Sequence, residues 1–483
     1  MTYHEIKLSR RFFMKGTGAA ALIGTTIGTA SLAGCAEQSD TSAQEAQNMA
    51  AASSEMNMER VNFDAGYNRV NTNSIKFDLI KMQNPGKKLD VGMGIADMDF
   101  RTLPEVTAAL KKRLETENWG YEIPPLDYPA NIVDWNKRRY NADVPKGNIL
   151  NSVGVLDGVL STLNAYGKEG DRVLLITPTY SSFFSTIHQA NMVEAESEMI
   201  RNADGRYEVD WDDFEEQIAS GIKLFILCNP QNPTGNCWTA DELRRMGDIC
   251  NAHGCLVLAD EIHCDFVMGD NKYVPYAELG EEYAMNSVSY KSTSKSFNLA
   301  AHRTGYLFSH NRDHIDAILK VGHQRLLLNI MGLIASNEAL KHGDQYIDRQ
   351  NAYLTENSKF VEQFCADRIP DIKYKAHEGT YLAWLDITAL IEKLDAANKA
   401  AELTAYNEAN NVTYVDFFGE EHIKRYNTGD YMKEWFMDNA KIDINPGENY
   451  GKGGAGFMRM NLATNRATLE KALSNIEEAI NTI

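Results

Sequence analysis

The stretch TADELRRMGDICNAHGCLVLADEIH, residues 239–263, predicts a complete helix followed by a buried strand. Thr239 fits the N-cap of the helix, Glu242 completes a capping box with it, and Gly254 fits the C-cap. Residues 255–259 then form a short uninterrupted apolar run, which is typical of a strand covered on both faces. A helix that leads directly into a buried strand is the repeating unit of an α/β fold.

The same alternation of apolar runs and amphipathic stretches extends from about residue 106 to residue 340, with no internal repeat. It predicts an α/β domain with a mainly parallel sheet at 106–344. Functional residues of such a domain are expected just beyond the carboxyl ends of the strands. The segments 61–105 and 345–483 are predicted to form a second, smaller α+β domain together. The strands predicted outside the quoted stretch are 172–176, 224–227, 287–290, 380–385 and 456–461.

The overall charge excludes one class of partner. The chain has 483 residues and a formal net charge of −19, which argues against nucleic-acid binding. Beyond Cys35 there are six cysteines, none in a C-x-x-C pair, so no metal site is predicted. Most of them are expected to be small buried side chains, and an occasional disulfide stays open.

The N-terminus is predicted to be a targeting segment rather than part of the fold. SRRFFMK at 9–15, a Gly-, Ala- and Thr-rich run at 16–34 and LAGC at 32–35 look like a twin-arginine export signal ending in a lipoprotein cleavage box. A transmembrane anchor is the alternative, but the run is only weakly apolar. Residues 1–35 would then be the signal, Cys35 the lipidated residue, and 36–60 a disordered tether. We expect export by the twin-arginine translocation machinery and a lipoprotein anchored on the extracytoplasmic side of a membrane, touching the membrane only through lipid.

Four motifs follow predicted strands and bear on chemistry: SVGVLDG (152–158), NPQNPTG (229–235), DEIH (260–263) and STSKSFNLAAHRTG (292–305). Each has an ordinary structural interpretation as a helix start, a turn, a cap or a solvated loop. Together they offer an anion cradle at a helix start, a strand-end carboxylate, a lysine and an arginine. A lysine for an aldehyde, an acid for a pyridinium nitrogen and ligands for a phosphate are the requirements of pyridoxal phosphate. Neither a Walker A loop nor a suitably placed GxGxxG favours a nucleotide instead.

With these motifs, residues 62–483 resemble the fold-type I pyridoxal-phosphate enzymes of the class I/II aminotransferase superfamily. The resemblance implies a large domain with a seven-stranded type of sheet and a small α+β domain. It implies that Lys295 forms the Schiff base with the cofactor and later moves the Cα proton. Asp260 would pair with the pyridine nitrogen, while Asn232 and His263 would lie near the phenolic oxygen. Tyr180 would stack on the ring.

The same resemblance implies the residues around the phosphate and the substrate. The N–H groups of Val155 and Leu156, with Ser292 and Arg303, would hold the phosphate. Tyr121 would reach that phosphate across the interface of a homodimer. The α-carboxylate of a small-molecule amino acid substrate would bind Arg459, which lies in the stretch FMRMNL at 457–462.

Several stretches are similar to one branch of this superfamily, the cystathionine β-lyase-like C–S lyases. They are IADMDF (95–100), WGY (119–121), DEIH (260–263) and SKSFNLA (294–300). This similarity implies β-elimination from cystathionine or related cysteine S-conjugates, yielding a thiol, pyruvate and ammonia. An aminotransferase acting on an L-amino acid and a 2-oxo acid is the alternative. A lipoprotein that keeps the fold only for binding is a third.

Overall fold

The computed structural model describes residues 61–66, 68–321, 328–415 and 420–483. The predicted signal at 1–35, with Cys35, and the tether at 36–60 lie outside the described residues. In the described part of the chain, no helix combines the length and apolarity needed to cross a membrane.

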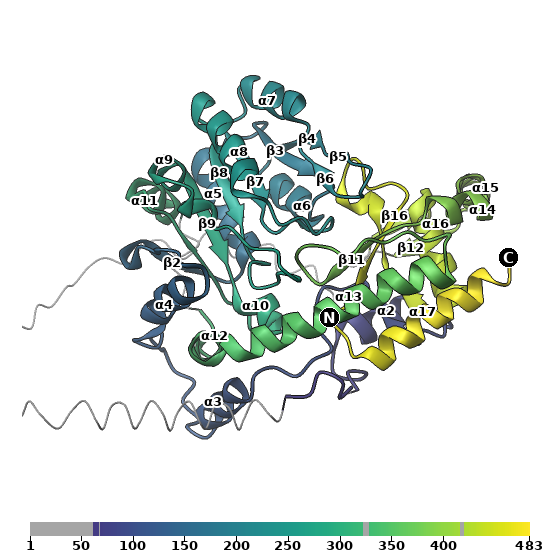
Figure 1. The fold of residues 1–483 in the computed structure, drawn as a ribbon, viewed down its shortest axis with the longest axis horizontal. Helices are drawn as coiled ribbons and strands as arrows, with labels where there is room; N and C mark the ends of the chain where they lie inside the picture. The colour runs from purple at the N-terminus through teal and green to yellow at the C-terminus, as the bar shows by residue number, and fades with distance from the viewer. Residues whose placement is uncertain (1–60, 67, 322–327, 416–419) are drawn as a thin grey trace, which may run out of the picture. The chain divides into compact units, whose positions relative to one another are not determined.

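A seven-stranded sheet forms the centre of the region predicted to be the large domain (Figure 1). In this sheet β10 runs opposite to the other six strands, and the pairs from β9 to β4 are all parallel, so the prediction of a mainly parallel sheet is confirmed. In sheet order the strands are β2 (Ile149–Ser152), β10 (Gly305–Phe308), β9 (Ser287–Lys291), β8 (Leu256–Asp260), β7 (Leu224–Cys228), β3 (Arg172–Thr177) and β4 (Val193–Glu198).

Helices cover both faces of this sheet, which explains why its central strands are apolar throughout. Alternate residues of β3 enter different clusters: Leu174 packs with one face and Val173 with the other. The first face is covered by α7 (Trp211–Ala219) and α8 (Ala240–His253). The second is covered by α5 (Val155–Tyr166), α6 (Ser182–Gln189) and α11 (Arg312–Lys320).

The quoted helix–strand unit is present as predicted. Thr239 and Glu242 form the capping box of α8, and Gly254 ends the helix in the left-handed conformation with φ +62°. The strand β8 begins one residue later than predicted and ends on Asp260, so a carboxylate is the last residue of a fully buried strand.

The C-terminal region has its own antiparallel sheet and apolar cluster. The sheet order is β11 (Leu382–Asp386), β16 (Phe457–Asn461) and β15 (Asn445–Pro446). Strand β1 (Val91–Gly92) pairs with β14 (Ile442–Asp443), which brings the N-terminal segment into the same cluster. The predicted strand at 380–385 starts later because Thr380 has φ +70°. The domain boundaries at 105/106 and 344/345 stay a prediction.

One long helix, α13 (Asp344–Arg368), belongs to two clusters. Its first half contributes Tyr346 and Leu354 to the cluster around Trp135, and its second half contributes Val361 to the C-terminal cluster. The remaining helices are α2 (Ile80–Gln83), α3 (Pro104–Leu114), α4 (Tyr128–Tyr140), α9 (Glu281–Met285), α10 (Thr293–Ser296), α12 (Ile330–His342), α14 (Thr388–Leu394), α15 (Ala396–Asn410), α16 (Thr428–Trp435) and α17 (Arg466–Ile480). Two hairpins pair β5 (Ile200–Arg201) with β6 (Tyr207–Glu208), and β12 (Thr413–Val415) with β13 (Glu421–Ile423).

The six cysteines of the described region are free and buried, as expected of most of them: Cys228, Cys237, Cys250, Cys255, Cys264 and Cys365. Among the described residues, no group of three or more His, Cys, Asp or Glu side chains is arranged to hold a metal ion.

Candidate active site

A cavity of about 820 Å³ lies at the edge of the sheet where the parallel strands end. The loops after β7, β8 and β9 contribute to it, as do the start of α5 and two N-terminal segments at 69–75 and 95–97. Eight of the predicted site residues line it: Val155, Leu156, Tyr180, Asn232, Asp260, His263, Lys295 and Arg303. A shared edge of one sheet therefore brings together residues spread over about a third of the chain, from Val155 to Arg303.

The pairing of β8 with β9 places Lys295 near Asp260. Asp260 lies opposite Tyr290 in this parallel pair, and the short helix α10 that carries Lys295 begins directly after β9. The Lys295 Nζ donates a hydrogen bond to the Ala96 carbonyl oxygen at 2.7 Å. Burial and, after it, the charge of Arg459 lower the pKa of Lys295, while Asp97 and Asp260 act in the opposite direction, and the net result is a pKa of about 8. The unprotonated amine is therefore far more abundant near neutral pH than for an ordinary lysine, although the ammonium form still predominates at pH 7.

Asp260 is a buried carboxylate without an ion-pair partner in the described part of the chain. Burial and, to a smaller extent, the charge of Glu261 raise its pKa, which is about 7 with all neighbouring groups included. A hydrogen bond from the Ile262 N–H at 3.1 Å and the charge of Lys295 oppose it. A cationic group placed beside Asp260 would return this carboxyl to its ionised form.

His263 is neutral in this environment. Burial, followed by the charges of Lys295 and Arg459, holds its pKa well below the ordinary value. Its Nδ1 is buried and has no hydrogen-bond partner among the described residues. A neutral imidazole can donate through one ring nitrogen and accept through the other.

Arg459 lies in the middle of β16 and reaches the site from the C-terminal sheet. One guanidinium nitrogen donates to the Gly94 carbonyl at 2.7 Å and another to Asn232 Oδ1 at 3.4 Å. The guanidinium also lies over the Tyr450 ring, 5.2 Å from its centroid, while Arg459 Nε is buried without a partner among the described residues. Arg459 does not line the cavity itself, but its charge acts on Lys295 and His263.

The predicted anion cradle is formed by the start of α5 and by Arg303. Gly154 precedes Val155, the first residue of α5, so the free N–H groups of this helix open at the cavity. Arg303 precedes β10, and because β10 is antiparallel, its first residue lies at the same edge as the ends of the parallel strands.

The structure supports the predicted phosphate role of Ser292 less well. The Ser292 hydroxyl donates to the Thr304 carbonyl at 2.6 Å and accepts from the Ser294 N–H at 3.0 Å. It thus caps α10, and Ser294 rather than Ser292 lines the cavity. Because the hydroxyl is engaged inside its own loop, the phosphate role of Ser292 stays a prediction.

Tyr121 lies away from the cavity. Its side chain is 99% exposed, beside the exposed residues Trp119, Ile123 and Leu126. The predicted contact across a dimer interface involves a second copy of the chain and stays a prediction. Cys35 lies outside the described residues.

Two features of the site were missed from sequence. The Tyr381 hydroxyl donates to the same Ala96 carbonyl as Lys295, at 2.8 Å, and the Tyr381 ring lies 6.0 Å from that of His263. Residues 72–75 and Asp97 line the cavity from the N-terminal segment. The only available signal was the similarity of residues 95–100 to the C–S lyases, which gave no role to any residue of that stretch.

Comparison with known proteins agrees with this geometry. A family model described as aminotransferase class I and II matches residues 88–476. The chain is 28% identical to the cystathionine beta-lyase PatB of Bacillus subtilis (strain 168), over 87% of this chain and 100% of that protein. Among solved structures, cystalysin from Treponema denticola, which contains a pyridoxal 5'-phosphate cofactor, is similar with a TM-score of 0.76 and 26% identity, covering 87% and 99% of the two chains. The PLP-bound C-S lyase from Staphylococcus hominis has a TM-score of 0.75 and 27% identity, covering 86% and 97%.

Proposed function

We propose, because the chain belongs to the aminotransferase class I and II family, that it is a pyridoxal-phosphate-dependent C–S β-lyase. Its substrates would be cystathionine or related cysteine S-conjugates, cleaved to a thiol, pyruvate and ammonia. The observation that carries the proposal is a half-buried lysine and a buried aspartate beyond the ends of adjacent strands, in a cavity that also has an anion cradle.

The residues present fit pyridoxal phosphate. Asp260 is buried and lacks the cation that a protonated pyridine nitrogen would supply. His263 Nδ1 and Arg459 Nε are buried polar atoms without partners in the described region, and both belong to the site. The start of α5 and Arg303 offer N–H donors and positive charge for a phosphate. Asp260, His263, Val155, Leu156 and Arg303 would hold the cofactor, with Lys295 as its covalent attachment.

The residues of the chain divide the remaining work. When bound, pyridoxal phosphate supplies an electron sink that makes the substrate Cα–H acidic. The guanidinium of Arg459 binds the substrate α-carboxylate and orients the Cα–H bond. Lys295 takes the Cα proton, because its lowered pKa leaves an unprotonated amine near neutral pH. Ionised Asp260 keeps a facing nitrogen protonated by charge pairing.

The deciding experiment supplies cystathionine without any 2-oxo acid and measures pyruvate and thiol. We expect both products from the wild type and neither from Lys295→Ala. Lys223→Ala, which changes a lysine just before β7 whose Nζ donates to the His253 carbonyl at 2.8 Å, is the matched control. Turnover that requires a 2-oxo acid would identify an aminotransferase instead. Absence of both turnover and a visible cofactor band would leave only the binding-protein alternative.

The exposed apolar side chains around Tyr121 support a homodimer as part of this proposal. Trp119, Ile123 and Leu126 are each at least 60% exposed. A contiguous exposed apolar segment is typical of a surface that another chain covers. Sedimentation of the purified protein should give a dimer. The Tyr121→Phe variant should remain a dimer but should retain the cofactor less tightly. A monomeric wild type would contradict this part.

Export and lipid anchoring are supported by the sequence alone. Replacing Arg10 and Arg11 together by lysine should leave the precursor in the cytoplasm, and Cys35→Ser should release the protein from the membrane fraction. Normal export of the double-lysine variant would contradict the twin-arginine route.

A further inference from the structure

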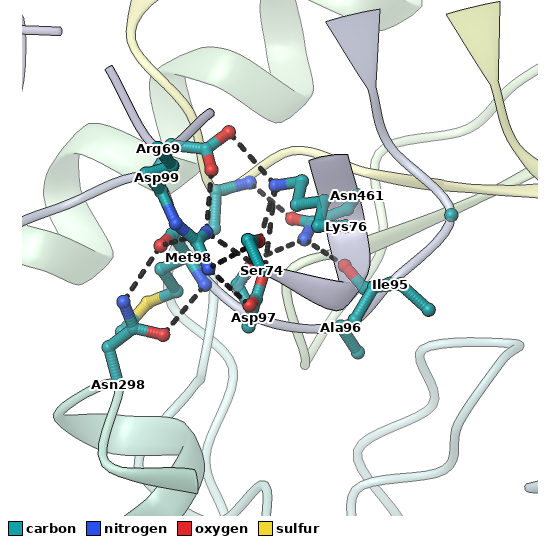
Figure 2. A network of polar contacts seen from close by, with 12 residues as sticks. Arg69, Ser74, Lys76, Ile95, Ala96, Asp97, Met98, Asp99, Asn298 and Asn461 are labelled. Atoms are coloured by element: carbon teal, nitrogen blue, oxygen red, sulfur yellow. Dashed lines mark hydrogen bonds and ion pairs between the residues drawn. The ribbon is translucent and has the colours of Figure 1, made fainter. Parts of the chain in front are cut away.

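A short irregular segment, residues 94–98, accepts hydrogen bonds from side chains that lie far apart in the chain. Figure 2 shows four of these donors: Arg69, Lys76, Asn298 and Asn461. Its carbonyls belong to no regular sheet or helix, so their partners are side chains rather than a backbone ladder. Met98, at its end, exchanges two hydrogen bonds with the side chain of Asn298. Arg69 also donates to the Met98 carbonyl, at 3.0 Å.

The carbonyls of this segment alternate between two sets of donors. Gly94 accepts from Arg459 and from Asn445 Nδ2, both at 2.7 Å, and Ala96 accepts from Lys295 at 2.7 Å and from Tyr381 at 2.8 Å. The Ile95 and Asp97 carbonyls share another donor, Asn461, and the Asp97 carbonyl also accepts from Lys76 Nζ at 3.3 Å. The Asn461 Nδ2 donates to the Ile95 carbonyl at 2.7 Å and to the Asp97 carbonyl at 2.6 Å.

Asn461 is well placed to fix this alternation. It is buried, and its Oδ1 accepts from the Ala463 N–H at 2.8 Å, which sets the direction of its amide. With the carbonyls on both sides of Ala96 bound to one amide group, the peptide plane of Ala96 cannot rotate freely. The Ala96 oxygen is thereby held toward Lys295.

We propose that the Ala96 carbonyl is the acceptor that positions the Lys295 amine, and that Asn461 and Tyr381 are positioning residues acting through it. Asn461 fixes the direction of the oxygen, and Tyr381 competes with Lys295 for its lone pairs. The Gly94 carbonyl holds Arg459 two residues away, so one segment sets the spacing of the nucleophile and the carboxylate-binding cation. This inference rests on the proposed role of Lys295.

The amine faces several other groups that set its protonation. Asp97 and Asp260 favour the ammonium form and Arg459 disfavours it, while His263 is held neutral. Burial also raises the pKa of the Tyr381 hydroxyl, which therefore remains a donor throughout the neutral range. The charged groups and His263 are unchanged in the variants described next, so a shift in the pKa of Lys295 reports a change at the Ala96 oxygen.

The test is the rate at which cofactor-free full-length protein takes up pyridoxal phosphate, followed by visible absorbance across pH. Only the unprotonated amine attacks, so the midpoint of the rate profile reports the pKa of Lys295. Tyr381→Phe removes a competing donor from the Ala96 oxygen, which then holds the ammonium more strongly, so the midpoint should rise by about 0.5 pH unit. Asn461→Leu releases the oxygen, so the midpoint should fall by about 0.5–1 pH unit and the plateau rate should drop several-fold.

Two matched controls separate positioning from general damage. Asn357→Leu removes another buried amide that bridges two alternate carbonyls, those of Leu462 and Thr464. Tyr374→Phe removes another buried hydroxyl, which is bonded to Ser358. Neither residue lines the cavity, so both variants should keep the wild-type midpoint.

Coincident midpoints in wild type, Tyr381→Phe and Asn461→Leu would overturn the inference even though all three take up the cofactor. If Asn461→Leu does not fold, the upward shift in Tyr381→Phe decides alone. A wild type that takes up no cofactor contradicts the proposed function instead.

Discussion

Two groups of buried charges share the segment 94–99 and differ in how they are paired. In the paired cluster, Arg69 contacts Asp97 at 2.5 Å and Asp99 at 2.8 Å, and Lys76 contacts Asp99 at 2.9 Å (Figure 2). In the site cluster of Lys295, Asp260 and Arg459, no ion pair joins any two members within the described region. Two cations and two anions cancel in the first, whereas the second keeps its charges apart.

The pairing of the charges decides whether a group stabilises the fold or remains available to a ligand. The paired cluster satisfies its charges internally and fixes the N-terminal segment against residues 97–99. In the site cluster, burial moves the pKa of Lys295 down to about 8 and that of Asp260 up to about 7, so both are driven toward their neutral forms. Such groups are costly to the fold and available to a ligand. Removing a charge should therefore destabilise the paired cluster but not the site cluster.

Lys295→Ala is expected to have the largest effect, on activity alone. Loss of the amine removes both the cofactor attachment and the group that takes the Cα proton, so kcat/KM should fall by at least about 10³-fold. Melting of the cofactor-free protein should show no loss of stability, because a buried amine has been removed. A clear destabilisation would break the comparison.

Lys76→Met should give the largest loss of stability. It leaves Asp99 buried with one cation fewer and removes the hydrogen bond to the Asp97 carbonyl. We expect a loss of about 3–5 kcal/mol in urea denaturation. Adding Asp99→Asn to this variant should restore part of the loss, because the carboxylate left with one cation fewer is then removed. Additive losses in the double variant would mean that the two residues do not act as a pair.

Asp260→Asn should stabilise the cofactor-free protein above pH 7. The folded pKa is raised above its ordinary value of 3.8 to about 7, so the folded state holds the proton more tightly. Stability contributed by the protonated form is therefore lost as pH rises from about 4 to 7. The variant should gain on the order of 2–4 kcal/mol at pH 8 and little at pH 4, measured by denaturation at both values. An equal effect at the two pH values would contradict the assignment.

Asp316→Asn should have the smallest effect on stability and serves as the exposed-pair reference for the other variants. Asp316 pairs with Arg312 at 2.9 Å, and both side chains are about half exposed. Such a pair contributes about 0–0.5 kcal/mol, so the melting temperature should scarcely change. A loss comparable to that of Lys76→Met would show that burial is not what distinguishes the paired cluster.

The large sheet and much of the site were predictable from sequence because their signals are local. Residues 255–259 are uninterruptedly apolar, Thr239 and Glu242 lie at capping-box spacing, and the strand-end position of Asp260 follows from both. The positions of Lys295 and Arg303 came from one short motif.

The remainder depends on contacts that carry no local pattern. Tyr381 and Ala96 meet through a backbone carbonyl, and because every residue type has such a carbonyl, no sequence pattern predicts the contact. The phosphate role of Ser292 was implied by the family resemblance, but its hydroxyl donates to the Thr304 carbonyl, a partner that only the fold brings near. The strand was predicted to begin at residue 380, which is too early, because no sequence signal showed that Thr380 has a left-handed backbone.

The contact between Arg459 and the Gly94 carbonyl joins residues 365 positions apart, which has a consequence for the order of folding. Lys295 and Arg303 lie between the neighbouring strands β9 and β10 in one short loop, so this part of the cofactor end closes with little loss of chain entropy. The substrate-binding end forms only when β16, which carries Arg459, meets the segment around Gly94, because this contact joins residues that are far apart in the sequence. We therefore expect a growing chain to complete the cofactor-binding end before the substrate-binding end. A chain cut short before β16 would lack Arg459 while retaining Lys295 and Asp260.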